Sequence, residues 1–111
     1  MNTIALPQPV ADFVKAENEH DSETLTACFT PDAVVYDDGA EMRGSQAIKE
    51  WAEEVSKAYN LTMEPTGLTE SEDETVLTAL VSGNFEGSPL EFQYTFNIKD
   101  GSITSLSCQV K

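Results

Sequence analysis

Hydrophobic residues recur at helical spacing in the first sixty positions and then change to the alternation of a β-strand. Val10, Phe13 and Val14 form the first apolar stripe. The helix that carries them is predicted to begin near Pro7 to Pro9, because proline fits the first helical turn, where its missing N–H removes no hydrogen bond.

A second, short helix and a strand are predicted next. Asp21 or Ser22 can cap this helix, which ends at Pro31. The strand runs from Ala33 to Asp37, and its apolar residues on both faces predict cover on both sides. Asp38-Gly39 is a strong turn signal and predicts a returning strand from Glu41 to Arg43.

The third predicted helix opens at Gly44-Ser45 and has the clearest amphipathic pattern in the chain. Its apolar face consists of Ile48, Trp51, Ala52, Val55 and Tyr59. After Asn60 the period changes to two, with a bulge or bend expected near Pro65 and Gly67. The strands predicted from this alternation are Leu61 to about Ser71, Thr75 to Phe85, Leu90 to Ile98, and Ile103 to Val110.

Short turns join these four strands, so they are predicted to form an antiparallel meander. Three helices followed by such a sheet predict one α+β domain over residues 1–111. The three N-terminal helices are expected to pack on one face of a curved antiparallel sheet.

The charge excludes some classes of partner. Twenty acidic residues against six basic ones give a net charge of −14, which disfavours nucleic acid and anionic membranes. No apolar run approaches the roughly 20 residues that span a bilayer. The first residues have no basic residue before Lys15 and no signal-like apolar core, so a cytoplasmic location is expected.

Motifs for metals and cofactors are missing from the sequence. Cys28 and Cys108 lie far apart without a CxxC motif, so a zinc site is not predicted, and both are interpreted as free, buried thiols, with a disulfide as the alternative. The acidic residues around Glu70 to Glu74 lack the pattern of a calcium loop. His20, the only histidine, is expected at the surface, with a role as a general acid or base as the alternative. No cofactor and no metal are predicted.

The order of elements and three local motifs resemble a known family. The motifs are NEHDSETL (Asn18 to Leu25), FTPDAVVYDDG from Phe29, and RGSQAIKEW from Arg43. Together they resemble the SnoaL-like branch of the nuclear transport factor 2-like superfamily, which has a cystatin-like cone. That superfamily includes ketosteroid isomerases, polyketide cyclases, dehydratases, epoxide hydrolases and members that only bind or assemble, so the resemblance implies the fold more than an activity.

Members with proton-transfer chemistry place a carboxylate base at the end of the first strand, and Asp37 matches that position. In ketosteroid isomerase, an aspartate base works with a tyrosine and a protonated aspartic acid. Here Phe13 occupies the helix position of the tyrosine and cannot donate a hydrogen bond. The second donor position falls near Tyr94, or near Gln93 if the turn is counted differently; Tyr94 is preferred because it shares an apolar face with neighbouring aromatic residues.

Each candidate residue also has a plainer interpretation. Asp37 is either a general base, a turn aspartate bonded to the Asp38-Gly39 backbone, or a binding carboxylate without catalysis. Tyr94 is either a pocket donor or a core aromatic residue. The residues expected to line a substrate pocket, with core packing as the alternative, are Phe13, Val35, Met42, Trp51 and Phe92.

Two functional hypotheses follow. In the first, a small cofactor-free protein binds a hydrophobic carbonyl metabolite inside the cone and acts as an isomerase, cyclase or dehydratase through Asp37, with Tyr94 stabilising the enolate oxygen. In the second, the chain is a non-catalytic dimeric module with a vestigial pocket. A homodimer is the expectation that the resemblance implies in either case.

Overall fold

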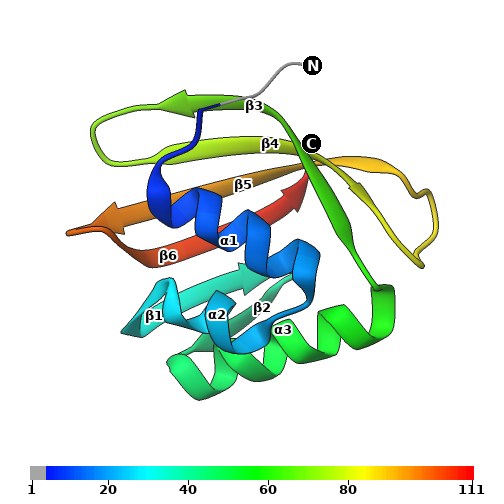
Figure 1. The fold of residues 1–111 in the computed structure, drawn as a ribbon, viewed down its shortest axis with the longest axis horizontal. Helices are drawn as coiled ribbons and strands as arrows, with labels where there is room; N and C mark the ends of the chain where they lie inside the picture. Colours follow the sequence, from blue (N-terminus) through cyan, green and yellow to red (C-terminus); the bar gives the residue numbers. More distant parts are fainter. Residues whose placement is uncertain (1–4) are drawn as a thin grey trace.

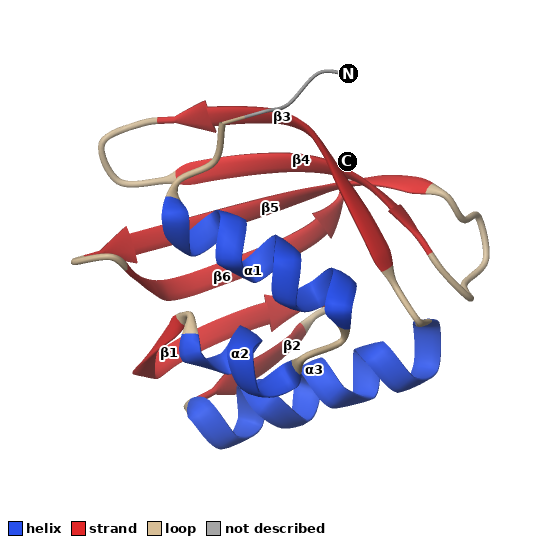
Figure 2. Ribbon diagram, in the orientation of Figure 1, coloured by secondary structure: helices blue, strands red, loops and turns tan. Residues whose placement is uncertain are grey.

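The computed structural model describes residues 5–111 as three helices and six strands (Figure 1). Residues 1–4, which form part of the N-terminal segment used to predict the location, lie outside the described residues. The elements, coloured by type in Figure 2, are α1 (Gln8–Glu19), α2 (Ser22–Ala27), β1 (Phe29–Asp37), β2 (Ala40–Arg43), α3 (Ser45–Tyr59), β3 (Thr62–Glu70), β4 (Thr75–Ser82), β5 (Leu90–Lys99) and β6 (Ser102–Val110).

The six strands form one mixed sheet in the order β2-β1-β6-β5-β4-β3. The predicted meander of β3 to β6 is confirmed, and β1 pairs antiparallel with β2. The expectation of a wholly antiparallel sheet is wrong at one place, because β1 and β6 pair in parallel. No short turn joins these two strands, so turn geometry does not oblige them to run in opposite directions.

The predicted helix starts follow the local chemistry. Pro7 precedes α1 and Pro9 lies in its first turn. His20, with a left-handed φ of 57°, ends the helix. The Asp21 carboxylate then caps α2 by accepting a hydrogen bond from the Thr24 backbone N–H at 3.1 Å.

Two strand boundaries differ from the prediction. β1 begins at Phe29, so Pro31 lies inside the strand, where the register against β6 shifts between Phe29 and Val34 because proline has no N–H to donate. β4 ends at Ser82, because the next segment turns away and the Asn84 N–H donates to the Tyr59 carbonyl at 2.7 Å. The bend expected near Pro65 is confirmed as a register shift between β3 and β4.

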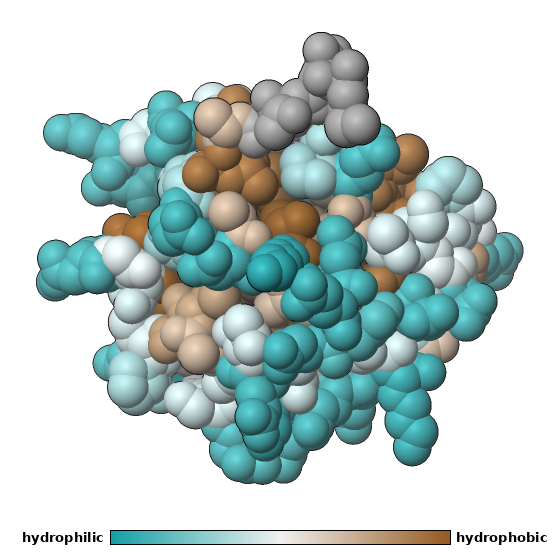
Figure 3. Space-filling view, viewed as in Figure 1, coloured by the Kyte–Doolittle hydropathy of each residue, from teal (hydrophilic) through white to brown (hydrophobic). Residues whose placement is uncertain are grey.

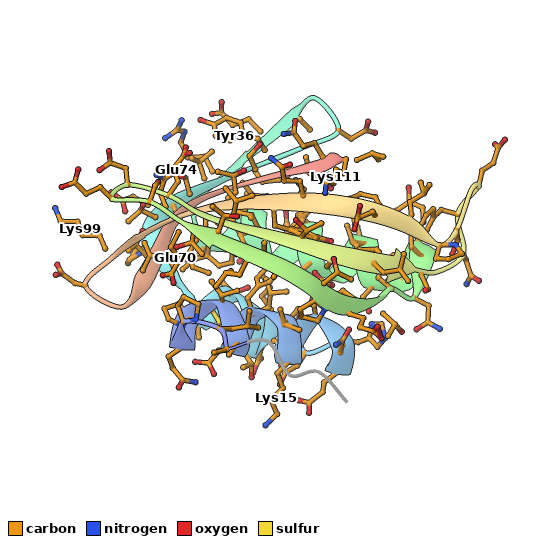
Figure 4. All side chains as sticks on the ribbon, turned by 90° about the horizontal axis from the view of Figure 1, so that it is seen from above. Lys15, Tyr36, Glu70, Glu74, Lys99 and Lys111 are labelled. Carbon is orange, nitrogen blue, oxygen red and sulfur yellow. The ribbon has the colours of Figure 1, made fainter. Side chains whose placement is uncertain are left out.

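All three helices lie on one side of the sheet, with α1 crossing the strands and α3 beneath β1 and β2 in Figure 1. Viewed from above, α1 lies on one side of the sheet and Tyr36 on the other, while Lys15 points away from the sheet (Figure 4). The core is centred on the fully buried Phe13 ring, which packs against Phe29, Tyr94 and Phe96.

The surface that carries the helices is largely hydrophilic, with apolar patches showing between the elements (Figure 3). This agrees with the net charge of −14. Within residues 5–111, every helix is too short or too polar to cross a bilayer.

Candidate active site

Three side chains that can exchange a proton or donate a hydrogen bond form a row across the sheet. Asp37 of β1 pairs with Cys108 of β6, and Cys108 pairs with Tyr94 of β5. Paired residues on neighbouring strands project to the same face of a sheet. Because Tyr94 and Cys108 are buried on the helix side, the row lies beneath the helices.

Helix α3 fixes the Asp37 carboxylate. The indole Nε1 of Trp51 donates a hydrogen bond of 2.9 Å to its Oδ2. The turn at Asp38 and Gly39, both with positive φ, and the short strand β2 bring the chain back so that α3 packs against β1. The bond leaves Oδ1 of the half-buried carboxylate available to another donor.

A second carboxyl group, Glu17 of α1, is buried with 5% of its surface exposed. Burial, and to a lesser degree the negative charge of Asp37, raises the Glu17 pKa to about 7. Among the described residues it takes part in no ion pair. Glu17 therefore changes its protonation near neutral pH, beside the row of Asp37, Cys108 and Tyr94.

The other two groups of the row stay protonated at neutral pH. Burial, followed by the neighbouring Cys108, Glu17 and Asp37, raises the pKa of the Tyr94 hydroxyl above its usual range. Burial likewise raises the pKa of the Cys108 thiol, with smaller contributions from Asp37 and Glu17. Tyr94 can thus donate a hydrogen bond, and Cys108 is a poor nucleophile.

An open cavity of about 1360 Å³ lies at the end of the sheet where β1 and β6 finish. Its walls come from those strand ends, the C-terminal half of α3, Leu61 just before β3, the connection between β4 and β5, and the start of β5. The side chains on these walls that matter for the argument are Asp37, Tyr59, Phe85, Leu90, Phe92 and Cys108.

Residues 10–106 match the family model of the SnoaL-like domain. The chain belongs to the SnoaL-like family. This confirms the resemblance seen in the sequence, and solved NTF2-like and cystatin-fold proteins share the fold of this chain.

Solved structures agree with this assignment. A candidate polyketide cyclase from Sinorhizobium meliloti is 40% identical with a TM-score of 0.90, over 94% of this chain and 95% of that chain. A protein from Catenulispora acidiphila with a ketosteroid isomerase-like fold, in complex with trimethylamine, is 20% identical, with a TM-score of 0.85 over 95% of this chain and 86% of its own. SalBIII, an epoxide hydrolase/cyclase-like enzyme with a role in pyran ring formation in the polyether salinomycin, is 18% identical. Its TM-score is 0.78, over 94% of this chain and 88% of its own. No curated protein matches the chain.

The structure places the predicted site residues of this SnoaL-like domain unevenly. Asp37 and Phe92 lie on the cavity wall. Tyr94 lies one step deeper, stacked between Phe92 and Phe96, and contributes no surface to the cavity. Tyr94 and the aromatic residues beside it do share the inward face, as the alternation predicted.

The remaining predicted lining residues lie behind the wall rather than on it. Phe13 and Val35 are fully buried in the core. Met42 and Trp51 are half-buried and pack against that core, although Trp51 reaches the site through its hydrogen bond to Asp37. The structure therefore supports core packing for these four residues rather than pocket lining. Trp51 in addition holds the Asp37 carboxylate in place.

Glu17 is the site residue that the sequence analysis missed. The sequence does contain a signal for it. Glu17 lies seven residues after Val10 and so continues the apolar stripe of Val10, Phe13 and Val14 along the helix. A carboxylate on the apolar stripe of a helix is unusual and points to a buried charge.

No cluster of ligands for a metal ion is present among residues 5–111. Both cysteines are free thiols; Cys108 is buried as expected, but Cys28 is only half-buried. His20 is exposed, with Nδ1 lying 2.8 Å from the Ser56 Oγ, which agrees with its expected surface position.

Proposed function

We propose that this SnoaL-like domain binds a hydrophobic carbonyl compound in the cavity and catalyses a proton transfer on it, of the isomerase, cyclase or dehydratase type. The observation that carries the proposal is the position of Asp37, which lies on the cavity wall with Oδ2 held by Trp51 and Oδ1 left available. The family assignment and the likeness to a candidate polyketide cyclase support it. A cytoplasmic location and the absence of a cofactor belong to the same proposal.

Asp37 is the general base in this proposal. Its carboxylate abstracts a proton from the carbon next to the substrate carbonyl, and an enolate forms. Such a base typically contributes about 10²–10⁴-fold to the rate. The Trp51 bond fixes the direction of the carboxylate, so the lone pairs of Oδ1 face an incoming substrate.

Tyr94 is the proposed donor to the enolate oxygen. Tyr94 lies behind Phe92 and Cys108, which are both on the cavity wall, so the proposal requires these side chains to move apart before a substrate contacts its hydroxyl. The raised pKa keeps that hydroxyl protonated. One hydrogen-bond donor of this kind typically contributes about 10²–10³-fold to kcat.

Glu17 is a second carboxyl group that can exchange a proton in this proposal. With a pKa of about 7, it accepts or releases a proton near neutrality while Asp37 changes its own charge. The pH dependence of the reaction therefore includes the ionisation of Glu17.

Ligand identification by native mass spectrometry, followed by assays on the compound found, tests the proposal. We expect Asp37→Asn to lower kcat by at least about 10²-fold and Tyr94→Phe by at least about tenfold. Asp73→Asn, the same change in the exposed turn between β3 and β4, is the control. Equal turnover by all of these proteins would remove the mechanism.

A second candidate function, a dimeric binding module without catalysis, is favoured by the helix-free face of the sheet. In a chain of net charge −14, the central rows of that face are uncharged: Thr78, Gln93 and Gln109 are paired in one row, and Thr95, Ser107 and Tyr36 in the next. Tyr36 is 42% exposed there. A second copy of this chain fits these two rows, because a contact centred on their uncharged side chains leaves Glu41 and Glu91, which lie beside them, at its rim.

Sedimentation measurements on Thr95→Lys test the dimer, with Lys15→Glu on the opposite side as the control. We expect Thr95→Lys to sediment as a monomer, and the wild type and Lys15→Glu to sediment as dimers. A wild-type chain that sediments as a monomer at about 100 μM would exclude this interface, since stable interfaces bind well below that concentration.

A further inference from the structure

The cavity has a wall of three aromatic rings, of which the sequence analysis singled out Phe92 as a pocket residue but not Phe85. Phe85, in the connection between β4 and β5, packs edge-to-face against Tyr59 of α3 and against Phe92 of β5. The ring centroids lie 6.2 Å and 6.3 Å apart, with interplanar angles of 87° and 82°. Each edge-to-face contact covers one face of one ring, and Tyr94 stacks on one face of Phe92, so the opposite faces of the rings are the ones left to a ligand.

Carboxylates surround the same cavity. Asp37, Asp38, Glu54 and Glu86 line it, against Lys57 as the single basic residue on the wall. Outside the cavity, a shallow hollow on α3 adds Glu50 and Glu53 beside Glu54 and Lys57. The field at the cavity therefore has the same negative sign as the whole chain, and clefts with low-dielectric walls concentrate such a field.

We propose that the cavity binds an organic cation: a substituted ammonium group whose alkyl substituents lie against the rings of Tyr59, Phe85 and Phe92 and whose charge is balanced by the surrounding carboxylates. This deepens the proposed function, on which it rests for the location of the binding site, by giving the hydrophobic substrate a positively charged nitrogen. Weakly hydrated cations are attracted to aromatic faces, and apolar walls do not penalise their alkyl surface.

The other classes of charged ligand fit less well. An anion would face four carboxylates with one lysine for compensation. A metal ion needs several oxygen, nitrogen or sulfur ligands in close array, and the described residues hold no such group. A substituted ammonium ion uses both features of the wall, the aromatic rings and the negative field.

Three probes of similar shape separate charge from hydrophobicity. Phenyltrimethylammonium carries the cation, tert-butylbenzene is its neutral isostere, and benzenesulfonate is an anion. Amide NMR shifts measured during titration locate each probe and give its Kd. We expect the cation to bind at residues of the cavity at least about tenfold more tightly than the neutral isostere, and the anion to leave the spectrum unchanged.

Two variants with a matched control assign the effect. Glu86→Gln is expected to weaken binding of the cation and leave binding of the neutral isostere unchanged, whereas Glu72→Gln, in the exposed turn between β3 and β4, changes neither. Phe85→Leu keeps an apolar side chain but removes the aromatic ring, so it should weaken binding of the cation by about three- to tenfold.

The outcomes separate the two proposals. If the neutral isostere binds in the cavity as tightly as the cation, the cation inference is wrong and the hydrophobic site of the proposed function stands. If no probe binds there, both fail. A cation preference that Glu72→Gln reduces as much as Glu86→Gln does would show attraction by the net charge alone and would also overturn the inference.

Discussion

The indole nitrogen of Trp51 lies 2.9 Å from the Oδ2 atom of Asp37 and joins the third helix to the end of the first strand. This bond holds the candidate base by a side chain that does not itself line the cavity. Trp51 is also the only tryptophan in the chain, so its fluorescence reports directly on the surroundings of Asp37.

A double-mutant cycle measures this bond. Trp51→Phe keeps an aromatic ring but removes the donor, and Asp37→Asn removes the charge of the acceptor. We expect a coupling in the free energy of unfolding of about 1–3 kcal/mol, because a hydrogen bond to a charged group exceeds a neutral one. Urea denaturation of the four proteins gives the value, and additive effects of the two changes would contradict the bond.

Glu17 makes the stability of the protein depend on pH. Its pKa is raised from 4.5 to about 7, so the folded state binds the proton more tightly than the unfolded state. The stabilisation from this group is fully present below about pH 4.5 and is lost as the pH rises through about 7. The gap between the two pKa values corresponds to about 3 kcal/mol at most.

Glu17→Gln should remove this dependence and make the protein more stable than the wild type at pH 8. Urea denaturation between pH 5 and 8 checks this on the scale of about 3 kcal/mol given above. Glu19→Gln, an exposed position on the same helix, is the control and should retain the wild-type slope. Parallel pH profiles for the wild type and Glu17→Gln would show that the burial of Glu17 has no such effect.

Gly83 lets the β4–β5 connection pass close to the end of α3. A Cβ atom at this position would lie 2.6 Å from the Tyr59 carbonyl oxygen and 2.8 Å from a Leu61 methyl group. We expect Gly83→Ala to lower the free energy of unfolding by about 1–3 kcal/mol, because the backbone must shift. Gly67→Ala, whose Cβ would meet Thr78 at an ordinary 3.9 Å, should have a smaller effect in the same denaturation assay.

The two thiols should both react slowly. Burial, and then the charge of Asp12, raises the Cys28 pKa to about 11, and burial also raises the Cys108 pKa well above its usual value. In a thiol-reagent assay at pH 7, Cys28→Ser should leave only a thiol that reacts when the protein unfolds. A fast phase in that variant would show that burial does not suppress the Cys108 thiolate.

The sequence predicted most of the architecture because periodicity and turn residues are local signals. The Asp38-Gly39 turn, the cap at Asp21 and the bend at Pro65 all appear where expected. The parallel pairing of β1 with β6 could not be predicted in this way, since no connecting turn encodes it.

The site was less predictable, because it depends on contacts between distant segments. Asp37 and Phe92 lie on the cavity, but Phe13 and Val35 belong to the core, and alternation alone cannot tell these positions apart. Glu17 had a signal, since it continues the apolar stripe of α1, but its partner Asp37 is known only from the fold.

Strand β6 is last along the described chain and central in the sheet, where it joins the β1–β2 hairpin to the other three strands. During synthesis, the two parts of the sheet therefore cannot meet until Ser102–Val110 has left the ribosome. The nascent chain must keep two unfinished edges apart until then, and the carboxylates that give the protein its negative field would also repel neighbouring copies during that wait.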